Sequence, residues 1–403
     1  MAVASALSAL PDAERADRRG ITLLSIAHLM NDANQSALPA IIPWLVAHRG
    51  LSLATAATLV LAMNLSSSIV QPLFGHWSDR RSLAWVIPVA LMVATVGTAI
   101  IGLSSSLPMM LAGALVSGIG VAAFHPEGSR FSNYFAGARR ATGMSWFTVG
   151  GYLGFALGPL AVTPLILAFG LRGTSVLVLP ALVIAILVWR QLPRFEEARR
   201  LAHHTHHERA GKDDWRGFSV LTGVVALRSM TFLAAVTFMP IFAIRVVHAD
   251  ATLGSLALAA LLFGGAFGTV WGGRIADRID RRRVVTLSLA LTAILAAAIA
   301  FAGIHAPFYG IVVLLATCFG ISLGLSAGVI VVIGQEYLPK RIGVASGLTL
   351  GLAVTVGGLA APMFGWIGDR YGLVLVFAAV AFFAVLSLAG SLFMSKPAHM
   401  ARA

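Results

Sequence analysis

Charged residues and cysteine are both scarce in this sequence. Only 11% of the 403 residues are charged, against about 25% in soluble domains. Cys318 is the single cysteine and lies in an apolar run, so neither a disulfide framework nor a thiolate metal site is available. The sequence also has no Gly-x-x-x-x-Gly-Lys-Ser/Thr stretch and no His-Glu-x-x-His stretch. We therefore expect neither an enzyme nor a cofactor.

Apolar residues take the place of the missing charge. They make up 58% of the chain, and a bilayer is crossed by about 20 mostly apolar residues in a helix. The sequence predicts an all-α membrane protein of about twelve transmembrane helices in two pseudo-symmetric six-helix bundles. The expected spans are 21–47, 53–74, 82–103, 108–131, 141–168, 174–190, 217–244, 252–273, 284–304, 308–333, 342–366 and 373–394.

A polar stretch near the middle of the chain divides these spans into two groups. The predicted segments are a tail (1–20), a first bundle (21–190), a linker (191–216), a second bundle (217–394) and a short tail (395–403). The linker contains His203, His204, His206 and His207, which can bind metals loosely. No fixed geometry is visible there, so we interpret the histidines as part of a solvated linker and predict no metal site.

The basic residues follow the topology of the spans. With both ends placed inside, the inner segments hold 24 Lys and Arg residues, the outer segments hold four, and Arg228 falls within a span. This asymmetry predicts a multi-pass protein of the plasma (inner) membrane with both termini and the linker in the cytoplasm. The net charge of +13 is thus explained without nucleic acid as a partner, and the bilayer is the partner expected.

Two short motifs recur at nearly one offset. Gly75-His-Trp-Ser-Asp79-Arg80 and Gly273-Arg-Ile-Ala-Asp277-Arg278 place their aspartates 198 residues apart. Arg140-Ala-Thr-Gly-Met-Ser145 and Arg341-Ile-Gly-Val-Ala-Ser346 are 201 residues apart. Two matches of this kind indicate a duplicated six-helix unit, an architecture known among transporters.

The Gly-x-x-x-Asp-Arg motif resembles the loop signature of the major facilitator superfamily. Longer stretches resemble its fosmidomycin-resistance branch, namely His28-Leu-Met-Asn-Asp32, Phe124-His-Pro-Glu-Gly-Ser-Arg130 and Gln335-Glu-Tyr-Leu-Pro-Lys-Arg-Ile-Gly-Val-Ala-Ser-Gly347. The resemblance implies the major facilitator fold and efflux of a compound in exchange for protons. In the loops, Asp79 and Asp277 could face helix N-termini or basic side chains; simple interfacial anchoring is the alternative.

Two charged residues lie deep in the predicted spans. Asp32 is 11 residues into the first span and Arg228 is 11 residues into the seventh, about 16 Å deep in each case. The repeat offset makes these two helices counterparts, and the resembled fold lines its central cavity with them. We predict that Asp32 and Arg228 form a central charge pair at which a proton and an anionic solute compete, although a purely structural salt bridge is the alternative.

Further polar residues surround these two positions. His28, Asn31 and Gln35 share the face of Asp32, and His28 could relay a proton or be satisfied by a neighbouring helix. His125, Glu127 and Arg130 fall near the inner end of span four, where Pro126 predicts a kink. We interpret them as an inner gate or proton exit, with an interfacial anchor as the alternative.

Glycines in span five predict close helix packing. Gly150, Gly154 and Gly158 form two overlapping Gly-x-x-x-Gly steps, and Gly158-Pro159 partly resembles a motif of drug:proton antiporters in the superfamily. We expect these contacts between the two halves, where they would suit rocking, although static packing explains them as well.

Secondary transport is the function that the sequence favours. We predict proton-coupled efflux, by antiport and alternating access, of a small drug-like compound or metabolite. An anionic group such as a phosphonate or carboxylate would suit Arg228. Proton-coupled uptake of a small metabolite is the alternative. The expected partners are the solute, protons and lipid, and the expected state is a monomer.

Overall fold

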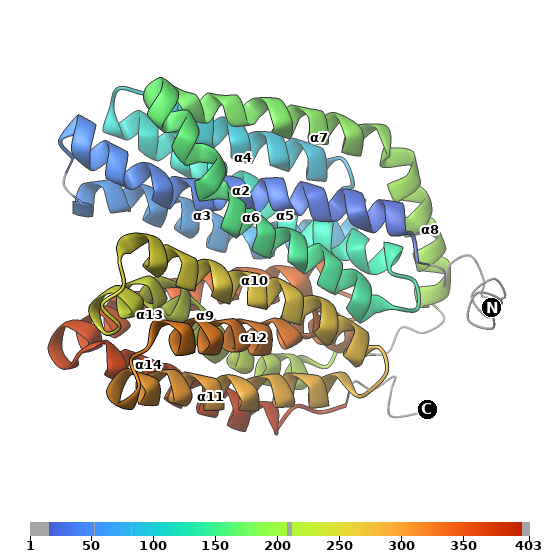
Figure 1. Cartoon of the computed structure of the whole chain (residues 1–403). Helices are drawn as coiled ribbons and strands as arrows, with labels where there is room; N and C mark the ends of the chain where they lie inside the picture. The colour runs from blue at the N-terminus through green and yellow to red at the C-terminus, as the bar shows by residue number, and fades with distance from the viewer. Residues whose placement is uncertain (1–15, 52, 82, 208–211, 397–403) are drawn as a thin grey trace, which may run out of the picture. The chain divides into compact units, whose positions relative to one another are not determined.

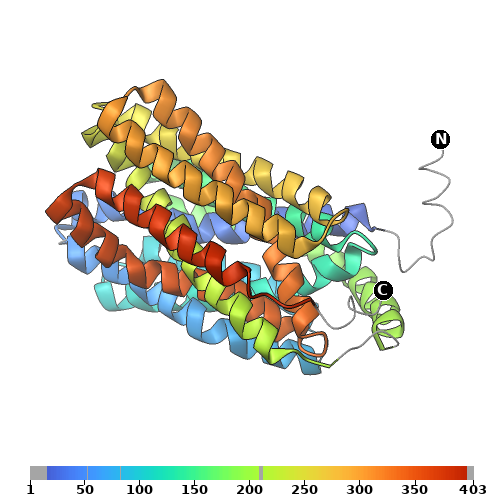
Figure 2. The same cartoon turned by 90° about the horizontal axis from the view of Figure 1, so that it is seen from below.

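The computed structural model describes residues 16–51, 53–81, 83–207 and 212–396. Helices account for all of the regular structure in these ranges, with no strand among them. The described residues fall into two compact units. Unit 1 comprises those of Met1–Lys212 and Pro339–Gly347, and unit 2 comprises those of Asp213–Leu338 and Leu348–Ala403. Figures 1 and 2 show the long helices of each unit from two directions.

Each half of the chain contributes six long helices. Those of the first half are α2 (Arg18–Arg49), α3 (Leu53–Arg80), α4 (Val86–Leu103), α5 (Leu107–Phe135), α6 (Arg140–Phe169) and α7 (Val178–Arg190), with the 3₁₀ helix η2 (Gly170–Leu177) before α7. Those of the second half are α9 (Trp215–Arg245), α10 (Ala251–Ala276), α11 (Arg281–His305), α12 (Tyr309–Tyr337), α13 (Ile342–Tyr371) and α14 (Leu373–Ser391).

The packing of the first half recurs in the second. In unit 1, α5 packs against α3 and α4, and α4 packs against α7. In unit 2, the corresponding helix α12 packs against α10 and α11, and α11 packs against α14. The sequence prediction of two pseudo-symmetric six-helix bundles is confirmed.

Most of the long helices described are apolar enough to span a membrane. Nine helical stretches of the described residues are both long enough and apolar enough to cross a bilayer. One of them, Arg140–Arg190, contains both α6 and α7. Counting α6 and α7 separately gives ten helices. The long helices α2 and α13 are less apolar, and with them the two bundles contain the predicted twelve. The mean hydropathy of α2 is lowered by the polar residues that form the candidate site below.

Much of the predicted linker is helical. Helix α8 (Leu192–His207) follows α7, and Phe195 is fully buried against the rings of Phe131 and Phe135, 5.0 and 4.9 Å away between centroids. Arg194 Nη2 donates to Asp17 Oδ1 at 2.8 Å, which fixes α8 to the start of α2. The stretch after Leu192 is therefore a packed part of unit 1. The side chains of the four linker histidines lie outside the described residues.

Helix α6 packs closely against α2 through its glycines. A Cβ atom added at Gly150 would lie 2.1 Å from the carbonyl oxygen of Ser25, and one added at Gly154 would lie 2.4 Å from that of Leu29. At Gly158 the same atom would lie 2.1 Å from Ser36 Oγ. The sequence analysis placed the contacts of these glycines between the two halves, whereas the structure shows them within unit 1.

We expect Gly154→Ala to lower the free energy of unfolding by about 1–3 kcal/mol, the usual range for overpacking. Its Cβ would meet backbone rather than a flexible side chain, so α2 and α6 must separate. Gly223→Ala is the matched control, since nothing lies within 4 Å of a Cβ at that helical position. The control is expected to keep or raise stability, because alanine favours helix by about 1 kcal/mol over glycine. The melting temperatures of the two variants in detergent test this prediction. Equal shifts in Gly154→Ala and Gly223→Ala would contradict the role of Gly154 in packing α6 against α2.

Candidate functional site

Three titratable side chains meet inside unit 1. His28 and Asp32 lie one turn apart on α2, and His125 reaches them from α5, which packs against α2. His28 Nε2 lies 3.2 Å from Asp32 Oδ2, and His125 Nε2 lies 3.3 Å from Asp32 Oδ1. The two Nε2 atoms are 3.3 Å apart. All three residues are at least nine-tenths buried. We call them the His–Asp–His cluster.

Backbone carbonyls fix the tautomer of both histidines. His28 Nδ1 lies 2.7 Å from the carbonyl oxygen of Phe147, and His125 Nδ1 lies 2.8 Å from that of Val121. A carbonyl oxygen only accepts, so both Nδ1 atoms donate. Both Nε2 atoms are then directed at each other and at the carboxylate of Asp32. Without a positive charge between them this arrangement is repulsive, and the cluster therefore has to hold at least one proton or another cation.

Helix α6 closes the cluster with backbone and an aromatic ring. The ring of Phe147 stacks on that of His28, with 4.1 Å between centroids and 22° between planes. A Cβ added at Gly151 would lie 2.8 Å from both Asp32 Oδ2 and His28 Cε1. A larger residue at position 151 would displace the cluster. Gly151 is not among the predicted site residues, because the glycine pattern of span five rests on the four-residue spacing of Gly150, Gly154 and Gly158.

Other polar residues of α2 join it to α3 and α4. Gln35 Nε2 donates to Asn64 Oδ1 at 3.4 Å on α3. Asn34, which the sequence analysis passed over, donates to Thr95 Oγ1 at 2.9 Å on α4. Asn31 Nδ2 donates to Asp32 Oδ1 at 3.2 Å. The polar stripe on α2 thus supports the cluster on one side and ties the helix into the bundle on the other.

Glu127 and Arg130 form a second buried group on α5, which continues as a helix through Pro126. Arg130 Nη1 donates to the carbonyl and hydroxyl oxygens of Ser78, and Nε donates to Tyr134 Oη at 2.8 Å. Glu127 Oε1 lies 3.6 Å from Arg130 Nη1, and neither of its carboxylate oxygens has a hydrogen-bond partner among the described residues. Arg130 therefore anchors α5 to the end of α3, beside a weakly paired acid.

The first Gly-x-x-x-Asp-Arg motif binds the start of α13. Asp79 accepts hydrogen bonds from the backbone N–H groups of Gly343 at 2.7 Å and Val344 at 3.0 Å, both in the part of α13 that belongs to unit 1. A Cβ added at Gly75 would lie 2.4 Å from the carbonyl oxygen of Gly343, so the motif's glycine permits this approach. Arg80 is exposed.

The second copy of the motif has basic side chains nearby. Asp277 lies 3.8 Å from Arg281 Nη2, and Arg281 Nη1 lies 2.7 Å from Glu336 Oε1. In the following loop, hydrogen bonds from Arg282 hold the pKa of Asp280 below its usual range. Gly273 is buried and Arg278 is exposed. The two copies therefore stabilise different contacts among the described residues.

We expect Asp79→Ala to lower stability by about 0.5–2 kcal/mol, as when a helix loses its N-terminal cap, and also to change the transport rate. The second effect follows because the bonds of Asp79 join α3 to α13. Asp250→Ala is the control, since Asp250 caps only its own helix through Leu253 N at 2.8 Å. Melting temperature and solute flux test both variants. If Asp79→Ala lowers the melting temperature but leaves the flux unchanged, Asp79 is a structural helix cap and has no role in transport.

Arg228 lies on α9 in unit 2 and binds α12. Its Nη2 donates to the carbonyl oxygen of Leu323 at 2.6 Å, and its Nε donates to Ser326 Oγ at 3.1 Å. No ion pair of Arg228 is found among the residues described. The predicted pair of Asp32 with Arg228 joins residues of different units and stays a prediction.

The internal repeat relates these contacts to one another. Adding the offset of 198 to 201 residues to His125 gives positions 323 to 326, which contain both partners of Arg228. The contact of Arg228 on α9 with α12 is thus the counterpart of the contact between Asp32 on α2 and His125 on α5. Beside these contacts unit 1 has an acid, Asp32, and unit 2 has a base, Arg228, within about one helical turn of the position equivalent to Asp32.

Comparison with known proteins places this chain in a family. The family model described as the Major Facilitator Superfamily matches residues 24–362. The chain belongs to the major facilitator superfamily. Within it, the chain is 31% identical to the fosmidomycin resistance protein of Escherichia coli (strain K12), over 91% of this chain and 90% of that protein. It is 30% identical to the uncharacterized MFS-type transporter YfnC of Bacillus subtilis (strain 168), over 91% of each.

Solved structures of the superfamily share the fold. The proton:xylose symporter XylE bound to 6-bromo-6-deoxy-D-glucose matches with a TM-score of 0.74 at 16% identity, over 94% of this chain and 96% of that one. FucP in the outward conformation matches with a TM-score of 0.71 at 13% identity, over 94% and 99%. The family resemblance inferred from the sequence motifs is confirmed, and the protein is an integral membrane transporter of this superfamily.

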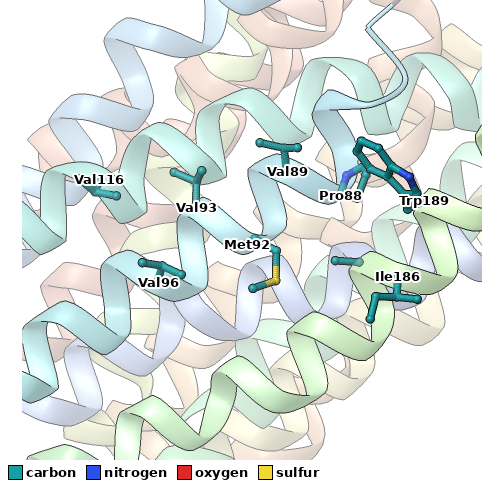
Figure 3. A pocket seen from close by; sticks show the side chains of 9 residues that line it. Pro88, Val89, Met92, Val93, Val96, Val116, Ile186 and Trp189 are labelled. Carbon is teal, nitrogen blue, oxygen red and sulfur yellow. The ribbon is translucent and has the colours of Figure 1, made fainter.

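A groove on unit 1 of the transporter lies apart from these polar sites (Figure 3). It has a volume of about 370 Å³ and lies between α4, α5 and α7. Its lining is wholly apolar: Pro88, Val89, Met92, Val93, Val96, Val116, Ala185, Ile186 and Trp189. The groove offers no group that could bind an ionic solute or carry a proton, so the buried polar residues remain the candidate site.

Proposed function

We propose that this transporter exports a small compound bearing an anionic group, in exchange for protons. The observation that carries the proposal is the His–Asp–His cluster, three buried titratable groups in direct contact. Ionisable residues inside a membrane are costly and typically mark ion or proton pathways. The similarity to a protein named for fosmidomycin resistance supports efflux as the direction.

The cluster is suited to exchange a proton. With one proton it contains an imidazolium, a neutral imidazole and a carboxylate. A second proton converts the other imidazole as well and changes the net charge from zero to plus one. Phe147 and Gly151 contribute only backbone and apolar atoms from α6, so Asp32 is the acid that compensates both rings. Each step changes the repulsion between α2 and α5, which can couple protonation to movement of these helices.

Arg228 is suited to hold the anionic group of the solute. Among the described residues its hydrogen-bond partners are a carbonyl and a hydroxyl oxygen, and neither neutralises the positive charge that would attract an anion. The guanidinium keeps that charge at any physiological pH and can bind a carboxylate or phosphonate through two parallel hydrogen bonds. We further propose a plasma-membrane location with both termini in the cytoplasm, on the basis of the distribution of basic residues, and a monomeric state.

Transport in proteoliposomes tests the function directly. Vesicles with an acidic interior are diluted into alkaline medium that contains a labelled anionic compound, with fosmidomycin as the first candidate. Antiport predicts accumulation, because protons leaving the vesicle drive the compound inwards. Accumulation only under the reversed gradient would establish the alternative, proton-coupled symport. Transport that ignores both gradients would reject proton coupling.

A further inference from the structure

The His–Asp–His cluster also has the spacing of a metal site. Zn²⁺ binds histidine nitrogen and carboxylate oxygen at about 2.0–2.2 Å in a tetrahedron, which sets neighbouring ligand atoms about 3.3–3.6 Å apart. The two Nε2 atoms are 3.3 Å apart, and they lie 3.2 and 3.3 Å from the carboxylate oxygens that they face. The separation of the two Nε2 atoms therefore matches one edge of a zinc coordination shell, and each Nε2 atom lies at a similar distance from a different oxygen of Asp32.

The surroundings of the two rings match those of metal-binding histidines. Such a histidine almost always donates its other ring N–H to a carbonyl or carboxylate, which orients the ring and makes the ligating nitrogen more basic. Both histidines do this here, through the carbonyl oxygens of Phe147 and Val121. The free nitrogen of each ring is thereby fixed toward Asp32, and the site is formed before any ion arrives.

The residue before Asp32 has an unsatisfied side-chain oxygen. Asn31 is fully buried, and its Oδ1 has no hydrogen-bond partner among the described residues, although its Nδ2 donates to Asp32. An unsatisfied buried amide oxygen is costly, and a cation at the neighbouring carboxylate would give it a partner. Two nitrogens with oxygen favour zinc and related transition metals over Mg²⁺ or Ca²⁺, which prefer all-oxygen sites.

We propose that His28, Asp32 and His125 bind one divalent transition-metal ion, with Zn²⁺ the best match. The ion supplies the positive charge that the facing lone pairs and the carboxylate require, and it joins α2 to α5. This site goes beyond proton-coupled efflux. It uses the same two Nε2 atoms as the proposed proton exchange, so the ion and the protons compete for them, and the geometry holds whichever solute is carried. The sequence analysis predicted no metal site, since it placed His125 in a separate group from Asp32.

Binding to the purified full-length protein tests the proposal without any transport assay. The four linker histidines are first replaced by alanine, because a histidine tract binds transition metals by itself, and the purification tag contains no histidine. Calorimetric titration with Zn²⁺ then gives stoichiometry and affinity, and the visible spectrum of added Co²⁺ reports its coordination. One ion per chain is expected, with the Co²⁺ bands of a four-coordinate nitrogen–oxygen site.

Variants locate the ion. His28→Gln, His125→Gln and Asp32→Asn are each expected to weaken binding by roughly tenfold or more, since even indirect support of a ligand is worth 10–100-fold. His305→Gln is the control, because His305 is exposed on α11 and its loss should leave the affinity unchanged. His125→Cys is expected to restore binding, since a thiolate also ligates zinc. Melting temperatures without metal show whether each variant is folded. Absence of binding in the parent protein, or unchanged affinity in folded cluster variants, would overturn the proposal.

Discussion

Asp32→Asn is expected to reduce proton-driven accumulation in proteoliposomes to the level of protein-free vesicles. The carboxylate of Asp32 is the only acidic group that contacts both His28 and His125 among the described residues. An amide of the same shape has no negative charge to compensate an imidazolium. Without the carboxylate, the two histidines no longer hold a proton in the same way, and the cluster cannot exchange it. The measurement is uptake of labelled solute under an outward proton gradient.

Exchange without a gradient separates coupling from folding. If Asp32 serves only proton binding by the cluster, Asp32→Asn should still exchange labelled for unlabelled solute across the membrane at equal pH. Glu197→Gln is the matched control, a carboxylate-to-amide change at an exposed surface pair with Arg200, and it should behave like the parent protein. Gradient-driven accumulation that survives in Asp32→Asn would refute the coupling role. His125→Gln, which keeps Asp32, provides a second test should Asp32→Asn prove unstable.

The sequence predicted the helices well because the bilayer imposes them. A helix that crosses lipid must be long and apolar, so hydropathy alone located the spans, and the repeat of the Asp79 and Asp277 motifs grouped them into two halves. Helix α8 was missed since its first turns are highly charged. Its stability comes from the buried ring of Phe195 and from i, i+3 pairs such as Glu196 with Arg199, which a scan for apolar spans does not detect.

The contact between Asp32 and His125 was missed for a geometric reason. Depth along span four was counted from its outer end, which placed His125 and Glu127 together near the inner surface. In the structure α5 extends to Phe135, ten residues beyond His125, which places His125 about 15 Å from the C-terminal end of α5. Asp32 is 14 residues into α2, about 21 Å along it. These levels are close enough for two long side chains to meet, although a sequence alone does not show which faces of two helices are opposed.

The repeat relates two opposite charges, Asp32 and Arg228, that lie within about one helical turn of equivalent positions. In unit 1 the contact between α2 and α5 is built from Asp32 and His125, which can change their charge. In unit 2 the corresponding contact between α9 and α12 is built from Arg228 with a backbone carbonyl and Ser326, whose charge is constant. Duplication followed by divergence would thus have left one half with a titratable group and the other with a permanent cation.

Arg228→Gln is accordingly expected to raise the KM for an anionic solute by about 10- to 100-fold, because hydrogen bonds to charged groups contribute about 1.5–3 kcal/mol each. The proton dependence of the remaining transport should be unchanged, since the cluster of unit 1 is intact. Arg245→Gln is the matched control, an exposed arginine in the last turn of the same helix. The KM for a neutral analogue of the solute, measured in parallel, should change little in Arg228→Gln. If Arg228→Gln instead unfolds the protein and Asp32→Asn restores it, the two residues form the structural salt bridge that the sequence left as the alternative, and the anion-binding role is wrong.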